Sequence, residues 1–203
     1  MSGKDIPWPV SDELELADSL LQAAAPALEA ELEWLASCLQ ARLASYFGQP
    51  PAAPPLPGDI APPAIKQPGC PYSATIARYG LDAAERLIVA LALAPLLRPQ
   101  LLDVLWSRNE TTQRPFTEFG GTPGSPSFVP NAETACFLLA GDALGPRLAA
   151  IRRLAPEGRL ARADVLHLAT PASGDALLTG ALTLSPRFLA EALPGLPQAA
   201  RPE

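Results

Sequence analysis

The sequence predicts a mainly α-helical protein, with an N-terminal helix, a proline-rich linker and a winged-helix-like helical domain that carries a C-terminal β-hairpin. Three observations predict this architecture. Apolar residues recur every three or four positions near the N-terminus, nine prolines crowd into one stretch, and two short apolar runs flank a turn late in the chain. The expected boundaries are 1–47 for the N-terminal helical segment, 48–71 for the linker, 72–194 for the winged-helix-like domain and 195–203 for a flexible tail.

The N-terminal segment begins its helical pattern at Ser11, and Pro26 should interrupt the helix or start the next one. From Ala27 onward one apolar stripe follows helical spacing, formed by Leu28, Leu32, Leu35, Leu39, Leu43 and Tyr46. This stripe has two interpretations. It packs against its own domain, or it forms a short coiled coil or docking helix, so that chains could associate through residues 28–46.

Residues 48–71 contain the nine prolines. Such a composition favours extended polyproline II conformations and cannot form hydrogen-bonded ladders. We therefore expect a linker without regular secondary structure between the N-terminal helix and the later domain.

The stretch Leu81–Gly121 is the centre of the predicted domain. Asp82 and Glu85 form a capping-box pattern, and the apolar run that follows indicates a buried helix. Pro95 should stop or kink this helix. Pro99 suits the first position of a second helix, which ends near Trp106.

A polar loop with aromatic residues follows, and it is the most distinctive segment of the chain. At least one of Phe116 and Phe119 should be a buried anchor, and Gly120 or Gly121 should adopt a conformation that is costly for other residues. We take the exposed neighbours of the anchors as contacts for a partner. The candidate partner-binding residues are Arg114, Phe116, Glu118 and Phe119.

The C-terminal part has clear local signals. Asn131 is a good N-cap, and a helix over residues 143–154 should turn Leu148, Ile151 and Leu154 inward. Val165–Leu168 reads as a strand, residues 171–175 as a turn and Ala176–Leu184 as the returning strand. Ser185 and Pro186 should start a last helix.

Composition argues against several classes of function. A net charge of −6 with only two lysines disfavours a general nucleic-acid binder. The single histidine, His167, and the widely spaced cysteines predict no metal site, no cofactor and no catalytic constellation. No apolar run is long enough to span a membrane and no signal core is present, so we expect a cytoplasmic protein.

Several segments resemble a known family. The segments LDAAERLIVALALAPLLRPQLLDVLW, QRPFTEFGGTPGSPSFVPNAETACFLLAGD and ALLTGALTLSPRFL are similar to the region N-terminal to the ATPase module in bacterial AAA+ ATPases of phage-tail-like contractile injection systems. The resemblance covers most of residues 12–193 and implies winged-helix-like structure. That family's P-loop lysine and acidic metal-binding motif do not occur within these 203 residues, so we expect no ATP turnover.

The sequence therefore leaves two alternative functions. The first is a non-enzymatic adaptor that docks an AAA+ ATPase or an injection-system component to its client. The second is a winged-helix nucleic-acid-binding protein, which the acidic charge disfavours.

Overall fold

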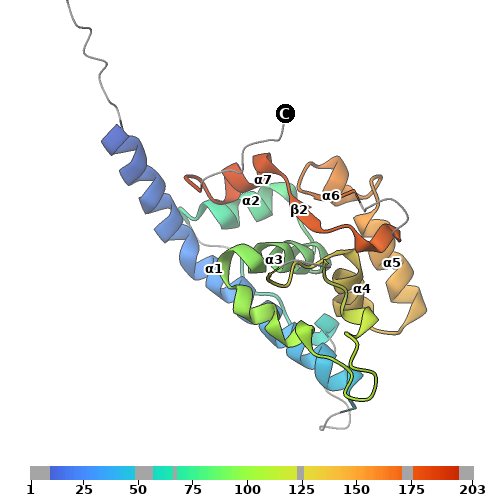
Figure 1. Cartoon of the computed structure of the whole chain (residues 1–203). Coiled ribbons are helices and arrows are strands. Elements are labelled where there is room, and N and C mark those ends of the chain that lie inside the picture. Colours follow the sequence, from blue (N-terminus) through green and yellow to red (C-terminus); the bar gives the residue numbers. More distant parts are fainter. Residues whose placement is uncertain (1–9, 49–56, 66–67, 123–125, 171–175, 197–203) are drawn as a thin grey trace, which may run out of the picture.

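The computed structural model describes residues 10–48, 57–65, 68–122, 126–170 and 176–196 (Figure 1). The chain is mainly helical, with a small two-stranded antiparallel sheet near its C-terminus, so the expected fold class is confirmed. The long helix α1 (Val10–Tyr46) runs along one side of the molecule, and the later elements pack against its C-terminal two thirds.

Helix α1 bears on two expectations, the break at Pro26 and the use of the apolar stripe that follows it. It continues through Pro26, whose ring is exposed, because Ala24 and Ala27 on either side pack into the core and hold the helix together. The stripe from Leu28 to Leu43 is buried in the same core as the later helices. The stripe therefore packs on its own chain, as the first interpretation expects, whereas association between chains through residues 28–46 stays a prediction.

The expected linker 48–71 does not separate two cores. Residues 57–65 lie against the helices, beginning with the 3₁₀ turn η1 (Pro57–Asp59). Trp34 Nε1 donates a hydrogen bond of 3.0 Å to the Ile60 carbonyl, and Arg86 donates one of 2.8 Å to the Pro63 carbonyl. These contacts attach a proline-rich segment without a ladder, which corrects the expectation of a loose linker there. Residues 49–56 and 66–67 lie outside the described residues.

The central elements follow the local signals. Helix α2 (Pro71–Tyr79) ends at Gly80, which has a φ of 58°, and helix α3 (Ala83–Leu97) begins with the predicted Asp82–Glu85 capping box. Pro95 lies in the last turn of α3. The next segment is a 3₁₀ helix, η2 (Pro99–Trp106), that meets α3 at a bend of 102°. Within the described ranges, no single helix has the length and apolar character of a membrane span.

The C-terminal half adds α4 (Ala132–Ala140), α5 (Leu144–Leu154), a short helix α6 (Arg159–Arg162) that the sequence did not indicate, and α7 (Pro186–Ala192). Asn131 and Ser185 cap α4 and α7 as predicted. One expectation for α5 is wrong, because Leu148 is 59% exposed.

The hairpin is shorter than expected. Strand β1 (Leu166–Leu168) pairs with β2 (Leu182–Leu184), whereas Leu177–Thr179 forms the 3₁₀ turn η4. The first residue of β2 also bonds to the loop before α4, because the Leu182 amide donates to the Pro130 carbonyl at 3.0 Å. The predicted turn at 171–175 lies outside the described part of the chain.

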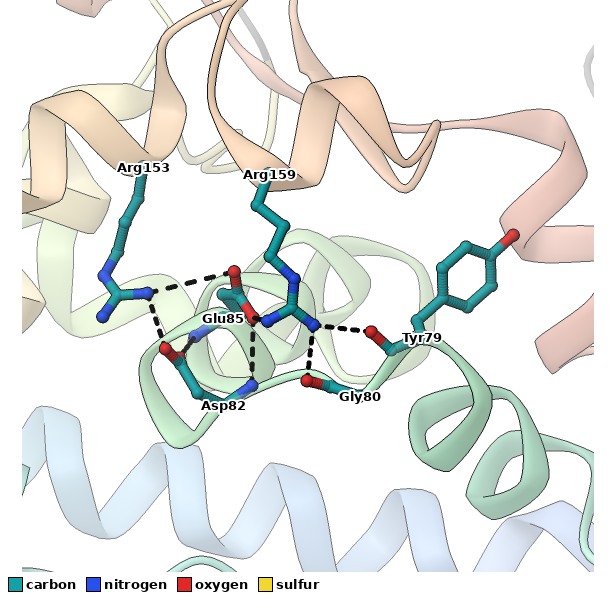
Figure 2. Close-up of polar contacts among 6 residues, drawn as sticks. All are labelled: Tyr79, Gly80, Asp82, Glu85, Arg153 and Arg159. Carbon is teal, nitrogen blue, oxygen red and sulfur yellow. Dashed lines mark hydrogen bonds and ion pairs between the residues drawn. The ribbon is translucent and has the colours of Figure 1, made fainter.

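A buried carboxylate joins the start of α3 to α6. The Glu85 side chain is 2% exposed, and its Oε2 accepts hydrogen bonds of 3.0 Å from the Asp82 amide and from Arg159 (Figure 2). Arg159 also donates to the Tyr79 carbonyl at 2.6 Å and to the carbonyl of Gly80. One guanidinium thus satisfies the C-terminal end of α2 and the buried acid of α3 together.

A second buried ion pair joins α3 to α1. Arg86 and Glu31 are each 5% exposed, and the guanidinium donates to Glu31 Oε1 through two nitrogens. The same guanidinium lies over the Trp34 ring, 5.6 Å from its centre. Burial raises the pKa of Glu31, although the charge of Arg86 opposes this change.

Because a buried charge without its partner is costly, replacing Arg86 by methionine should lower the free energy of unfolding by about 3–5 kcal/mol. Arg98→Met is the matched control, since Arg98 pairs with Glu29 in partly exposed positions and should cost less than about 1 kcal/mol. Urea unfolding would measure both. The double variant Glu31→Leu/Arg86→Met should recover part of the loss; equal effects of Arg86→Met and Arg98→Met would contradict the assignment.

Stability should also depend on pH through Asp82. Burial tends to raise the pKa of this carboxyl, but the Glu85 amide and the Arg153 guanidinium outweigh burial, so the pKa lies below its usual value. The carboxylate therefore stabilises the fold above the unfolded pKa of about 3.9, and this contribution is lost as pH falls through the folded pKa. Asp82→Ala should cost about 1 kcal/mol at neutral pH and less below about pH 3. Urea unfolding of parent and variant at both pH values measures this; a cost that does not change with pH would exclude the charge as its cause.

Candidate partner-binding site

The loop between η2 and α4 is built by local hydrogen bonds. Asn109 Oδ1 accepts from the Thr111 and Thr112 amides at 2.9 and 3.0 Å, and the Asn109 amide donates to the Arg114 carbonyl at 2.9 Å. The isolated bridge between Arg108 and Pro115 closes this turn. The chain then enters the short 3₁₀ helix η3 (Thr117–Phe119).

The paired glycines after η3 are required by close contacts. Gly120 has a φ of 69°, and a Cβ there would lie 2.3 Å from Asn131 Oδ1. Gly121 has a φ of 92°, and a Cβ there would lie 2.8 Å from the Phe128 ring. The expectation of a conformation costly for other residues is therefore confirmed at both positions. The glycines allow the loop to lie directly on the N-terminal end of α4.

The aromatic residues of the loop form one cluster with the end of α1. Phe119 is fully buried, and its ring centre lies 4.9 Å from Phe137 and 5.0 Å from Phe116. Tyr46 and Phe47, at the end of α1, pack edge-on against Phe116 at 5.8 and 5.5 Å. Phe119 is thus the predicted buried anchor, whereas Phe116 is only partly buried.

Arg114 and Glu118, the two charged candidates, are both exposed. Among the described residues, Arg114 has no ion-pair or hydrogen-bond partner for its side chain. Glu118 accepts from Thr117 at 3.3 Å and lies near the Tyr46 hydroxyl. Burial raises the pKa of Tyr46, and the charge and hydrogen bond of Glu118 raise it further. The role of Arg114 and Glu118 as partner contacts stays a prediction.

Three of the four predicted residues line one cavity of about 980 Å³; Phe119 lies beneath it as the anchor. The apolar wall includes Trp106, which is 40% exposed, and Leu177, which is 62% exposed. The polar wall includes the ion pair between Glu133 and Arg147, with a distance of 2.7 Å. Sequence reasoning missed these four residues, because they come from η2, η4, α4 and α5 and meet only in the folded chain.

The single histidine of the sequence does not line this cavity. His167 lies on β1, where its Nε2 is 2.9 Å from Asp164 Oδ1, and both side chains are about half exposed. In the described part of the chain, no cluster of three or more His, Cys, Asp or Glu side chains could hold a metal ion. The cavity itself combines exposed apolar side chains with exposed charge.

The only concentration of basic residues in the sequence is largely used within the protein. Arg147 pairs with Glu133, Arg153 with Asp82, and Arg159 with Glu85. Only Arg152 and Arg162 of this group have no ion-pair partner among the described residues. Phosphate-backbone binding needs several free cations on one face. This arrangement disfavours a nucleic-acid surface on α5 and α6.

Comparisons with protein-family models, with curated proteins and with solved structures found no match. The resemblance to the N-terminal region of injection-system AAA+ ATPases therefore stays a prediction.

Truncating each phenylalanine to alanine should distinguish the buried residue from the partly exposed one by the loss of stability. Phe119→Ala should destabilise the protein by about 3–5 kcal/mol, because it leaves a cavity in the core. Phe116→Ala is the matched control and should cost less, because Phe116 already touches solvent. Thermal unfolding followed by circular dichroism would compare them, and equal losses would show that the loop has a single, fully buried aromatic core.

Proposed function

We propose that this chain is a non-catalytic protein-interaction module that docks an AAA+ ATPase or another injection-system component to its client. The cavity beside the Arg114–Phe119 loop is the proposed binding site. The main support is that two exposed apolar side chains, Trp106 and Leu177, line the same cavity as the unpaired guanidinium of Arg114. Tryptophan and arginine are the residues that most often dominate the energy of protein interfaces.

The construction of the site supports the same proposal. A recognition surface needs a rigid support so that little entropy is lost on binding. Here Phe119 and the two glycines fix the loop to α4, while Phe116 and Arg114 remain accessible. The alternative, a winged-helix nucleic-acid binder, has no comparable support, because most arginines of α5 and α6 are paired with carboxylates.

Direct binding measurements test the proposal. Purified AAA+ ATPases and injection-system proteins from the same genome would be titrated against the immobilised full chain by biolayer interferometry. At least one should bind, and Trp106→Ser or Arg114→Glu should weaken it by on the order of tenfold or more. Leu96→Ser is the matched control, because Leu96 is 58% exposed but lies outside the cavity.

Two results would contradict the proposal. One is the absence of any binding partner among these proteins. The other is binding that Trp106→Ser and Arg114→Glu leave unchanged. A duplex DNA titration at physiological salt completes the test, since tight binding that resists salt would favour the nucleic-acid alternative.

A further inference from the structure

The first turns of α1 extend beyond the folded body and carry uncovered leucines. Figure 1 shows this end of α1 projecting at one side of the molecule. Leu14 and Leu16 are 59% and 62% exposed there. Leu14 continues the stripe that α1 buries further along, through Ala17, Leu21 and Ala24. The apolar face of α1 therefore runs past the surface that covers it.

This end of α1 is also strongly acidic. Between Val10 and Leu20 the helix contains four carboxylates and no lysine or arginine. Glu15 and Asp18 are exposed and have no ion-pair partner within the described ranges. Two such ends would repel each other if they came together. A favourable partner for this end of α1 must therefore combine apolar side chains with positive charge.

Helix α5, on the opposite side of the molecule in Figure 1, has that combination. Leu144 and Leu148 are 68% and 59% exposed, and Arg152 follows one turn later on the same face. The helix contains three arginines and no acidic residue. Arg152 has no ion-pair partner in the described part of the chain. Arg147 and Arg153 pair with Glu133 and Asp82 of the same chain, so Arg152 is the arginine of α5 that a carboxylate of a second copy can pair with.

We infer that copies of this chain bind one another head to tail, with the acidic, leucine-bearing end of α1 on one copy packed against the basic, leucine-bearing face of α5 on the next. The spacings agree. Leu14 and Asp18 are four residues apart, as are Leu148 and Arg152, so both pairs span one helical turn. Because the two surfaces lie on opposite sides of the molecule, two copies cannot make both contacts with each other at once. The contact therefore repeats from copy to copy and produces a ring or a filament rather than a closed dimer.

The experiment measures assembly of the full chain by sedimentation equilibrium, up to about 0.5 mM so that weak contacts are populated. The α1 variant is Leu14→Gln, because Leu16 lies only two residues further along the helix and faces away from Leu14 and Asp18. The α5 variant is Leu144→Gln/Leu148→Gln. All three leucines are exposed, so circular dichroism should show parent-like folding. Leu96→Gln is the control, an exposed leucine outside both surfaces.

The parent and Leu96→Gln should form assemblies larger than dimers as concentration rises. The α1 variant and the α5 variant, each alone, should associate at least tenfold more weakly. Their equimolar mixture should form a one-to-one dimer and nothing larger, because each variant supplies the surface that the other lacks. The inference is overturned by a monomeric parent, by parent-like assembly of either variant, or by a mixture that stays monomeric.

Charge reversal tests the pairing itself. Asp18→Arg or Arg152→Asp alone should weaken association at least tenfold at low salt, since each places like charges together. The combined variant should restore association toward that of the parent. If the combined variant associates no better than the single variants, the pairing of α1 with α5 is wrong.

Discussion

Two adjacent charged residues in the first turn of α3 bind three distant parts of the chain through buried ion pairs and hydrogen bonds. Glu85 and Arg86 are both buried, and they point to different parts of the chain. Glu85 binds Arg159 of α6, and Arg86 binds Glu31 of α1 and the Pro63 carbonyl. Each charge is costly to bury alone, so each requires its partner to be present. The N-terminal helix, the proline-rich segment and α6 are thereby all bound to the start of one helix.

This constraint also explains how the candidate site is formed. With α1 fixed against α3, the end of α1 presents Tyr46 and Phe47 to the loop that follows η2. Phe119 fills the space between α1 and α4, and the two glycines allow the loop to approach Asn131 and Phe128. The loop is therefore held from two sides, although it contains little regular structure. Its remaining exposed side chains form the wall of a cavity because the backbone beneath them is fixed.

The distribution of charge connects the fold with the two proposals. Most arginines in the described part of the chain bind carboxylates or backbone carbonyls of the same chain, as Figure 2 shows for Arg153 and Arg159. The few that stay unpaired, such as Arg114 and Arg152, each lie beside exposed apolar side chains. The acidic excess gathers on α1. Surfaces of opposite charge at different places on one molecule give direction to association without requiring a large apolar area.

The sequence by itself determined the features that depend on neighbouring residues. Capping at Asp82, Asn131 and Ser185, the left-handed Gly80 and the mainly helical class follow from hydrogen bonds and spacings within about four residues. The candidate loop was found for the same reason, from its aromatics and paired glycines. The tertiary structure alone decided the continuity of α1 through Pro26, the 3₁₀ turn in the expected returning strand and the burial of Phe119 rather than Phe116. These depend on contacts between distant residues, such as Arg42 Nε to the Leu138 carbonyl across 96 positions, and no local pattern encodes which distant partner will supply them.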